Sequence, residues 1–216
     1  MSEKNLIQWK CLEEKVFLDF PYLQIVERLC QKQGSPPLSG VDGSPPAEYP
    51  PHRYYVLKSR DWCNILPITE EGKIVLIRQF RAGTANTPYE FPGGVIETSD
   101  ENLKHAALRE LLEETGYAPG DASAIQHLGS ANPNPALQDN VVHSFMVSGV
   151  RKVKAQELDP GEDVVVEEKS VAEFFQLLNE GKFNHALMLT SLFFLLQTAL
   201  KSEGLEKTFK NFLSAR

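Results

Sequence analysis

The chain has 216 residues, of which 42% are hydrophobic, and its formal net charge at pH 7 is −7. This length and apolar content suffice for one catalytic domain with a small appended segment and do not call for several domains. The negative charge argues against a general nucleic-acid-binding surface. The three cysteines are too few and too scattered for a disulfide framework or a zinc site, which indicates a reducing compartment.

No segment of the sequence has the composition expected of a membrane span. The N-terminus lacks a long apolar secretory core, and the most apolar stretch, residues 186–200, is short and contains Thr190, Ser191 and Gln197. This stretch is typical of a buried amphipathic helix. We therefore expect a soluble, cytoplasmic protein without a membrane partner.

The first predicted strands cover residues 16–20 and 23–29, and a proline-rich segment follows them at residues 31–52. This segment contains three proline pairs. Because prolines remove backbone donors and glycines add conformational freedom, it is predicted to be a long irregular loop. The loop is either a tolerated surface insertion or a segment with a role towards substrate or a partner.

Regular strand patterning resumes beyond this loop. Strands are predicted at residues 53–58, 62–68, 74–80 and 89–91, with a hairpin turn at 70–73. After a glycine turn and an acidic helix, strands are predicted at residues 125–130, 141–148 and 164–169, and helices near 171–179 and 186–201. This order predicts a mixed sheet flanked by helices.

The acidic helix has recognisable ends. Thr98 and Glu101 match the capping box that starts a helix, and Gly116 suits the left-handed residue that ends one. Leucines and alanines between these positions form an apolar stripe that can dock on a sheet. The glutamates of the helix are then expected to face outward, towards solvent or a ligand.

Glu110, Glu113 and Glu114 are three or four residues apart, so a helix gathers their carboxylates on one side. Like charges this close repel one another unless a cation joins them. Hard oxygen ligands suit Mg²⁺, which usually binds through a few carboxylates together with substrate phosphates. The alternative is an ordinary solvated acidic face.

The glycine turn and the helix together resemble the Nudix box, whose pattern is glycine, five residues, glutamate, seven residues, arginine–glutamate, and then a glutamate pair and a glycine. Six residues rather than five separate Gly94 from Glu101, which we interpret as one residue inserted in the turn. The resemblance implies that Glu110 and Glu114 are the principal metal ligands, with Glu113 and the Gly93 carbonyl as further ligands. The motif positions with an implied structural role are Gly94, Glu101, Arg109 and Gly116, of which Glu101 and Arg109 tie loop to helix.

Three further segments resemble the ADP-ribose pyrophosphatase branch of this family. They are VLIRQFR with YEFPGG, Pro133 at sixteen residues beyond Tyr117, and the carboxy-terminal segment that starts at GEDVVVEEK. The resemblance implies an α/β (α+β) fold, a Nudix-type α/β/α sandwich with a mixed sheet, preceded by antiparallel strands. The implied divisions are residues 1–52 (a dimerisation or substrate-facing region), 53–203 (the Nudix domain) and 204–216 (a tail or helix).

The same resemblance places Arg78, Arg81 and Glu90 along a diphosphate pocket, with Pro133 at its border and Glu162 as a base that activates water. Arginine suits this role because its planar fork holds two phosphate oxygens and stays charged. The alternatives are a sheet-edge ion pair for each arginine and a charged surface turn for Glu162.

An aromatic side chain is expected to stack on the base of the substrate. Trp62 is the first candidate, with Tyr54, Tyr55 and Phe20 as alternatives, from the same chain or a neighbouring subunit. Each of these is equally compatible with core packing. The two histidines with the most apolar neighbours, His143 and His185, are interpreted as structural.

The expected activity is Mg²⁺-dependent hydrolysis, with Mn²⁺ as a substitute, of a nucleoside diphosphate linked to a sugar. ADP-ribose is the first candidate and gives AMP and ribose 5-phosphate, with Glu110, Glu113, Glu114 and Glu162 as the catalytic residues of a homodimer. The alternatives are a nucleotide-sugar pyrophosphatase of the GDP-mannose type, a nucleoside triphosphate hydrolase, or a nucleotide-sensing module without catalysis. The sequence does not define the base, the sugar or the number of metal ions.

Overall fold

The computed structural model describes residues 8–34 and 49–201. It divides into two compact units, residues 1–59 with 134–139 and residues 60–133 with 140–216. The sequence-based division at 52/53 falls earlier, because the strand that begins at His52 pairs with the strand before it and so belongs to the first unit. Most of the predicted proline-rich loop and all of the predicted tail lie outside the described residues.

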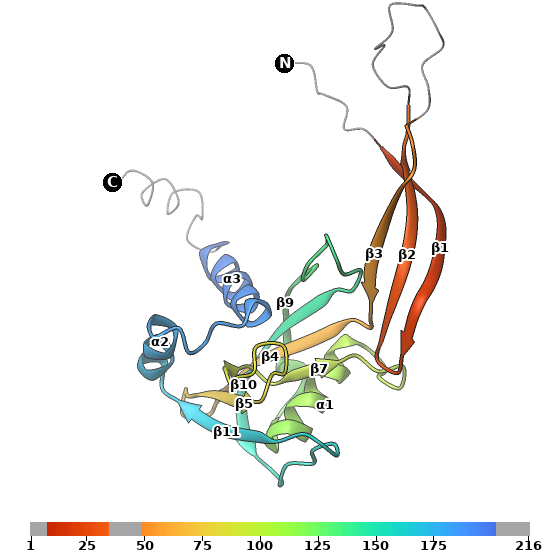
Figure 1. Ribbon diagram of the computed structural model, residues 1–216. Coiled ribbons are helices and arrows are strands. Elements are labelled where there is room, and N and C mark those ends of the chain that lie inside the picture. Colours follow the sequence, from red (N-terminus) through yellow and green to blue (C-terminus); the bar gives the residue numbers. More distant parts are fainter. Residues whose placement is uncertain (1–7, 35–48, 202–216) are drawn as a thin grey trace, which may run out of the picture. The chain divides into compact units, whose positions relative to one another are not determined.

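The first unit is a three-stranded antiparallel sheet in the order β1 (Trp9–Phe20), β2 (Leu23–Lys32), β3 (His52–Lys58), drawn in red and orange in Figure 1. The first two strands are longer than predicted. Charged residues and two register shifts in β1 hide the alternation of apolar and polar side chains that marks a strand. Residues 134–139 join this unit: the Leu57 N–H donates to the Leu137 carbonyl over 2.7 Å, and Arg28 pairs with Asp139 at 3.1 Å.

The second unit contains an eight-stranded sheet, whose longest path runs β11-β5-β4-β10-β8. Its strands are β4 (Trp62–Thr69), β5 (Ile74–Gln79), β6 (Tyr89–Glu90), β7 (Gly93–Val95), β8 (Tyr117–Pro119), β9 (Gln126–Ala131), β10 (Val142–Lys152) and β11 (Val164–Lys169). β10 and β4 are parallel and the other pairs are antiparallel, so the predicted mixed sheet is confirmed.

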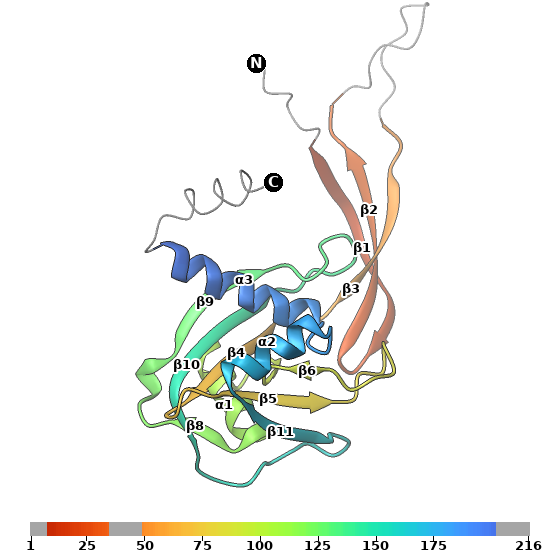
Figure 2. The same ribbon diagram turned by 90° about the vertical axis from the view of Figure 1, so that its left-hand side faces the viewer.

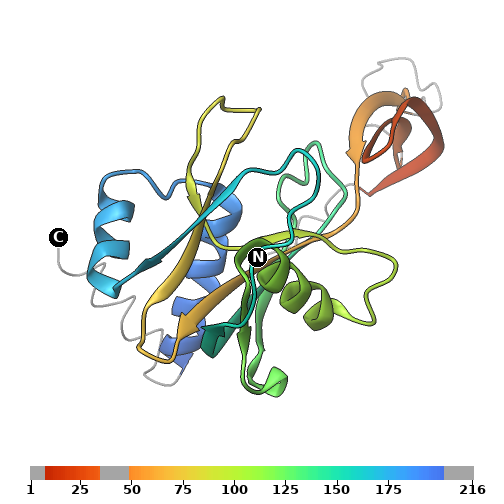
Figure 3. The ribbon, with the colours of Figure 1, turned by 90° about the horizontal axis from the view of Figure 1, so that it is seen from below.

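Helices cover both faces of this sheet. α1 (Leu103–Thr115) packs on one face, and α2 (Val171–Asn179) and α3 (Ala186–Lys201) lie together over the other (Figures 2 and 3). Successive side chains of β5 point to opposite faces of the sheet. Val75 belongs to the apolar cluster that includes α1, and Leu76 belongs to the cluster that includes Phe174 of α2. The expected α/β/α sandwich is therefore confirmed.

The start of α1 differs from the prediction. The helix begins at Leu103, and the side chain of Asn102 caps it by accepting hydrogen bonds from the N–H groups of Lys104 and His105, each over 3.0 Å. The predicted capping box of Thr98 and Glu101 is therefore wrong, because Asn102 is an equally good cap closer to the first apolar turn. The end is as predicted: Gly116 adopts a left-handed φ of 74°.

Within residues 8–34 and 49–201, none of the helices is both long and apolar enough to cross a membrane.

Candidate active site

The three α1 glutamates differ in their exposure to solvent. Glu114 is only 3% exposed, whereas the side chains of Glu110 and Glu113 are 13% and 39% exposed. The expectation that all three face outward is therefore wrong for Glu114. That residue lies one helical turn beyond Leu111 and so continues the buried stripe of α1.

Two glycines of β7 let the backbone approach these carboxylates closely. The Gly93 N–H donates a hydrogen bond to Glu114 Oε2 over 2.8 Å. A Cβ atom at Gly94 would lie 2.7 Å from Glu110 Oε1, and one at Gly93 would lie 2.2 Å from the Cys63 carbonyl oxygen. Only glycine fits at either position without displacing the acidic groups or the neighbouring strand.

Burial makes these carboxylates unfavourable as anions. It raises the pKa of Glu110 to about 7 and that of Glu114 to about 8, and the negative charge of Glu162 adds to both shifts. The protein thus supplies less positive charge here than the carboxylates need. A bound cation would correct this imbalance.

The donor chemistry of the cluster fits a hard divalent cation. Glu110, Glu113 and Glu114 offer carboxylate oxygens from one helix, next to the backbone of Gly93. In the described ranges no three acidic, histidine or cysteine side chains already converge in metal-binding geometry. Arg109 Nη1 donates to Glu110 Oε1 over 2.9 Å and to Glu113 Oε2 over 3.0 Å, so one oxygen of each carboxylate is already hydrogen-bonded.

Arg109 also ties the helix to the loop before it, but its partner there is not the predicted one. Its Nε and Nη2 atoms donate to the two oxygens of Asp100, each over 3.0 Å, and Nη2 donates to the Val95 carbonyl over 3.1 Å. Hydrogen bonding to Arg109 lowers the pKa of Asp100 to about 2. Glu101, which the sequence placed in this role, is exposed.

The position of Asp100 explains the irregular spacing of the box. Five residues separate Gly94 from Asp100, as the pattern requires, and the extra residue lies between Asp100 and Arg109. The side chain of Asp100 is 1% exposed and reaches the guanidinium in bidentate geometry. The inserted residue therefore lies on the helix side of the acid and leaves the glycine turn at its ordinary length.

A second buried carboxylate, Glu90, lies between Arg81 and His185. Arg81 Nη2 donates to Glu90 Oε2 over 2.6 Å, and His185 Nδ1 lies 3.0 Å from Glu90 Oε1. Burial alone would raise the pKa of Glu90, but the contacts with His185 and Arg81 outweigh it and hold the pKa below its usual value. Arg81 and Glu90 are thus in contact with each other, and their predicted place along a diphosphate pocket stays a prediction.

His185 is a contact that the sequence did not identify. It precedes α3, and the sequence motif FNHAL carries no signal for a partner on β6.

Glu162 lies in the exposed loop between β10 and β11. Its Oε2 accepts a hydrogen bond from the Asp159 N–H over 3.2 Å. Its charge acts on Glu110, Glu114 and Arg81, raising the pKa of each. The loop therefore holds this carboxylate within electrostatic range of the acidic cluster.

Two other predicted substrate residues, Arg78 and Trp62, lie on the face of the sheet that α1 does not cover. Arg78 alternates with Leu76 of β5, and Trp62 alternates with Asn64 of β4, whose side chain bonds to Leu187 and Ser191 of α3. Both side chains thus belong to the face covered by α2 and α3. Arg78 is the cross-strand partner of Tyr89, and Ile77 is that of Glu90, so the side chains of Arg78 and Glu90 lie on opposite faces of the sheet and are not brought together.

Pro133 is partly buried and follows β9, where the chain passes from the second unit into residues 134–139. Its place at the border of the substrate stays a prediction, as does the Gly93 carbonyl as a metal ligand.

The fold and the acidic helix define a hydrolase built on an α/β/α sandwich. A family model described as NUDIX domain matches residues 59–190. The chain belongs to the Nudix family, and the predicted enzyme class, a Nudix hydrolase, is confirmed.

Relatives and a solved structure agree with this assignment. The chain is 34% identical to an ADP-ribose pyrophosphatase of Bacillus subtilis over 115 residues, which are 53% of this chain and 60% of that protein. It is 32% identical to a methanol dehydrogenase activator of Bacillus methanolicus over 139 residues, 63% of this chain and 73% of the relative. The crystal structure of an ADP compounds hydrolase has the same fold, with a TM-score of 0.71 at 21% identity, covering 93% of this chain and 98% of the other.

Proposed function

We propose that the protein hydrolyses the diphosphate bond of a nucleoside diphosphate linked to a sugar, with ADP-ribose as the first substrate and AMP and ribose 5-phosphate as products. The observation that carries this proposal is that the buried Glu114 and the half-buried Glu110 pack against Gly93 and Gly94 without a sufficient counter-charge. The relatives named ADP-ribose pyrophosphatase and, in mouse, ADP-sugar pyrophosphatase support the choice of substrate.

Glu110, Glu113 and Glu114 would hold Mg²⁺, or Mn²⁺ in its place. When bound, the cation supplies positive charge that stabilises the diphosphate oxygens in the transition state. The Gly93 N–H orients Glu114, and Arg109 orients Glu110 and Glu113. These contacts hold the ligands in place before substrate arrives.

Arg81 and Glu162 would act on the substrate. Arg81 uses Nε and Nη2 to bind Glu90, so we assign its Nη1 to a phosphate oxygen. Glu162 would accept the proton of the water that attacks phosphorus, because its loop lies within range of the acidic cluster. The exposed position of this loop allows it to close over a bound ligand.

Exposed apolar side chains of the first unit support a homodimer. Trp9 is 43% exposed, Phe17 59%, Phe20 51% and Tyr22 90%. Trp9 packs on Tyr54 and Phe17 packs on Tyr55, the next residue of β3, so aromatic side chains are exposed on both faces of this sheet. A second copy would cover part of this apolar surface and could present Tyr54 or Tyr55 to the base of the substrate. Light scattering after size exclusion should give a molar mass twice that of the chain. In Phe17→Ser the measured mass should fall towards that of a single chain.

The activity is tested by incubating the purified protein with ADP-ribose and Mg²⁺ and measuring AMP. AMP should appear with Mg²⁺ and should not appear when EDTA replaces it. GDP-mannose, UDP-glucose and a nucleoside triphosphate are measured beside ADP-ribose, and faster turnover of one of them would replace ADP-ribose as the substrate. Tight binding of ADP-ribose without turnover of any compound would contradict catalysis and favour a nucleotide-sensing module.

A further inference from the structure

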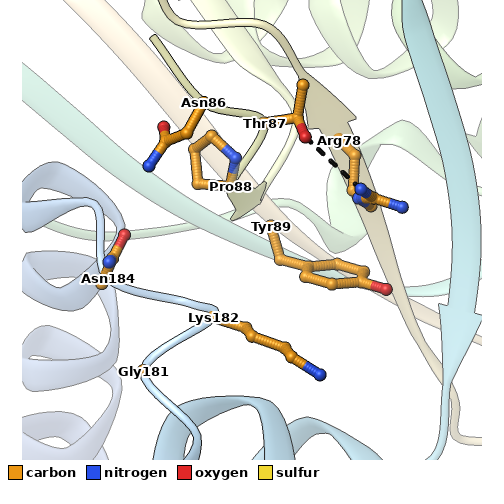
Figure 4. A pocket seen from close by; sticks show the side chains of 8 residues that line it. All are labelled: Arg78, Asn86, Thr87, Pro88, Tyr89, Gly181, Lys182 and Asn184. Atoms are coloured by element: carbon orange, nitrogen blue, oxygen red, sulfur yellow. Dashed lines mark hydrogen bonds between the residues drawn. The ribbon is translucent and has the colours of Figure 1, made fainter. Parts of the chain in front are cut away.

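A pocket of about 420 Å³ lies between the β5–β6 hairpin and the connection from α2 to α3 (Figure 4). Its lining residues come from these two segments, and they are Arg78, Asn86, Thr87, Pro88, Tyr89, Gly181, Lys182 and Asn184. The backbone joins the two walls, because the Tyr89 N–H donates to the Lys182 carbonyl over 3.1 Å. The pocket is thus part of the folded second unit.

This pocket is separate from the acidic cluster of α1. Tyr89 packs against the apolar cluster that includes α2 and α3, and Arg78 is its direct cross-strand partner. Both side chains therefore point to the face of the sheet that α1 does not cover. The side chains of Arg78 and Tyr89 and those of Glu110 and Glu114 therefore lie on opposite sides of the sheet.

The lining of the pocket is cationic and rich in hydrogen-bonding groups. Arg78 and Lys182 provide positive charge, and none of the lining residues is acidic. The amides of Asn86 and Asn184 and the hydroxyl of Thr87 can both donate and accept. Pro88 and the Tyr89 ring add apolar surface (Figure 4).

The guanidinium of Arg78 retains unused hydrogen-bonding capacity. Its Nε is buried without an acceptor, and its Nη2 reaches Thr87 Oγ1 only at 3.4 Å. The nearest carboxylate, Glu167, lies 3.7 Å from Nη1 and instead accepts from the Tyr89 hydroxyl over 3.2 Å. The Arg78 side chain is 40% exposed, so the terminal Nη1 and Nη2 can donate to an acceptor that a ligand in the pocket supplies.

The ammonium of Lys182 is also available. Its ion pair with Glu180, at 2.8 Å, is on the surface, and the Lys182 side chain is 60% exposed. Surface pairs of this kind contribute little free energy. The lysine can therefore exchange Glu180 for an anionic ligand at small cost.

We propose that this pocket binds a sugar phosphate. Arg78 and Lys182 would bind the phosphate, since a guanidinium fork and a nearby ammonium are a common combination for phosphate. Pockets of roughly 300–1,000 Å³ accept small organic ligands, and an inorganic phosphate would leave most of this one unfilled. The amides and Thr87 suit sugar hydroxyls. The Tyr89 ring carries the Arg78 guanidinium at 5.2 Å from its centroid and so positions it in the pocket. Binding here does not depend on the proposed catalytic function.

The proposal is tested by isothermal titration calorimetry of the full chain in EDTA, which removes divalent cations from the acidic cluster. Ribose 5-phosphate, ribose and inorganic phosphate are titrated separately. Ribose 5-phosphate should bind, inorganic phosphate should bind more weakly, and ribose should give no heat of binding. No binding of ribose 5-phosphate, or binding no tighter than that of phosphate, would overturn the proposal.

Variants locate the site. Arg78→Gln should weaken ribose 5-phosphate binding on the order of tenfold or more, and Lys182→Gln by roughly threefold to tenfold. Lys152→Gln, which removes an exposed charge at the end of β10, is the matched control and should bind as the wild type does. Glu110→Gln should also bind normally, whereas altered binding in that variant would place the ligand at the acidic cluster and refute the second site. Thermal unfolding of each variant checks that the fold is retained. Arg78→Lys keeps the charge without the guanidinium fork, so its affinity for ribose 5-phosphate should lie between those of the wild type and Arg78→Gln.

Discussion

Glu90 and Glu114 are both buried glutamates of the second unit, with 0% and 3% exposure, but their electrostatic surroundings are opposite. Glu90 lies between Arg81 and His185, and its pKa is lowered. Glu114 receives one hydrogen bond from the Gly93 N–H and faces Glu110 and Glu162, and its pKa is raised to about 8. The charge of Glu90 is balanced by groups of the protein, whereas the charge of Glu114 would be balanced only by a bound cation. The first glutamate is therefore expected to support the fold, and the second to support catalysis.

The largest expected effect is on turnover in Glu114→Gln. This change removes an anionic metal ligand and keeps the size of the side chain, so AMP release from ADP-ribose should fall about a thousandfold. The free energy of unfolding without metal should stay within about 0.5 kcal/mol or rise, because no ion pair of the protein is broken. Steady-state kinetics with Mg²⁺ and urea unfolding in EDTA measure the two effects. If Glu114→Gln turned over ADP-ribose as fast as the wild type, Glu114 would not be a metal ligand.

The matching change at the balanced carboxylate, Glu90→Gln, should act mainly on stability. It leaves Arg81 and His185 beside a neutral group, so the free energy of unfolding should fall by about 2 kcal/mol, less than for a fully buried pair because Arg81 is 37% exposed. Urea unfolding at pH 7 provides the measurement. A variant as stable as the wild type would show that the two glutamates do not differ as the structure indicates.

Asp100→Asn compared with Glu101→Gln tests which acid holds Arg109. Asp100→Asn weakens a bidentate, buried ion pair and should lower the free energy of unfolding by about 1–2 kcal/mol. Turnover should fall too, because Arg109 orients Glu110 and Glu113. Glu101→Gln changes an exposed side chain, so its free energy of unfolding should stay within about 0.5 kcal/mol of the wild-type value. The reverse result would restore Glu101 to the role that the sequence gave it.

The smallest expected effect concerns acid stability. The pKa of Asp100 is about 2 in the folded protein, below its ordinary value of 3.8, so its ionised form stabilises the folded state. This stabilisation is fully present above about pH 4 and is lost as the pH falls through 2. Urea unfolding between pH 6 and pH 2 should show a shallower decline in Asp100→Asn than in the wild type. Glu101→Gln should follow the wild-type curve.

Several elements could be predicted from the sequence because their local signals agree. The bounds of β11, α2 and α3 are those predicted, and a run of three valines and a complete capping box at Ser170 and Glu173 mark the first two of them. The glutamates of α1 were identified from their spacing. The hairpin between β4 and β5 also forms, with Gly72 in its turn.

Other features could not be predicted because they depend on tertiary contacts or on choices between similar residues. Asp100 and Glu101 are adjacent acids, and only the loop geometry decides which one reaches Arg109. Burial of Glu114 depends on how α1 docks against β7. The separation of Arg78 from Glu90 depends on the register between β5 and β6, which pairs Arg78 with Tyr89 and is not visible in the sequence.

The first unit is assembled from two stretches of chain, because residues 134–139 bond to β2 and β3 through Asp139 and Leu137. Deletion of the first 59 residues would therefore leave this second stretch behind without its neighbours. Dissecting the protein cleanly requires replacing residues 134–139 as well. The ends to be joined are close, since the Asn132 side chain donates to the Asn140 carbonyl over 3.4 Å, so a short hairpin turn from β9 to β10 would close the excised Nudix core.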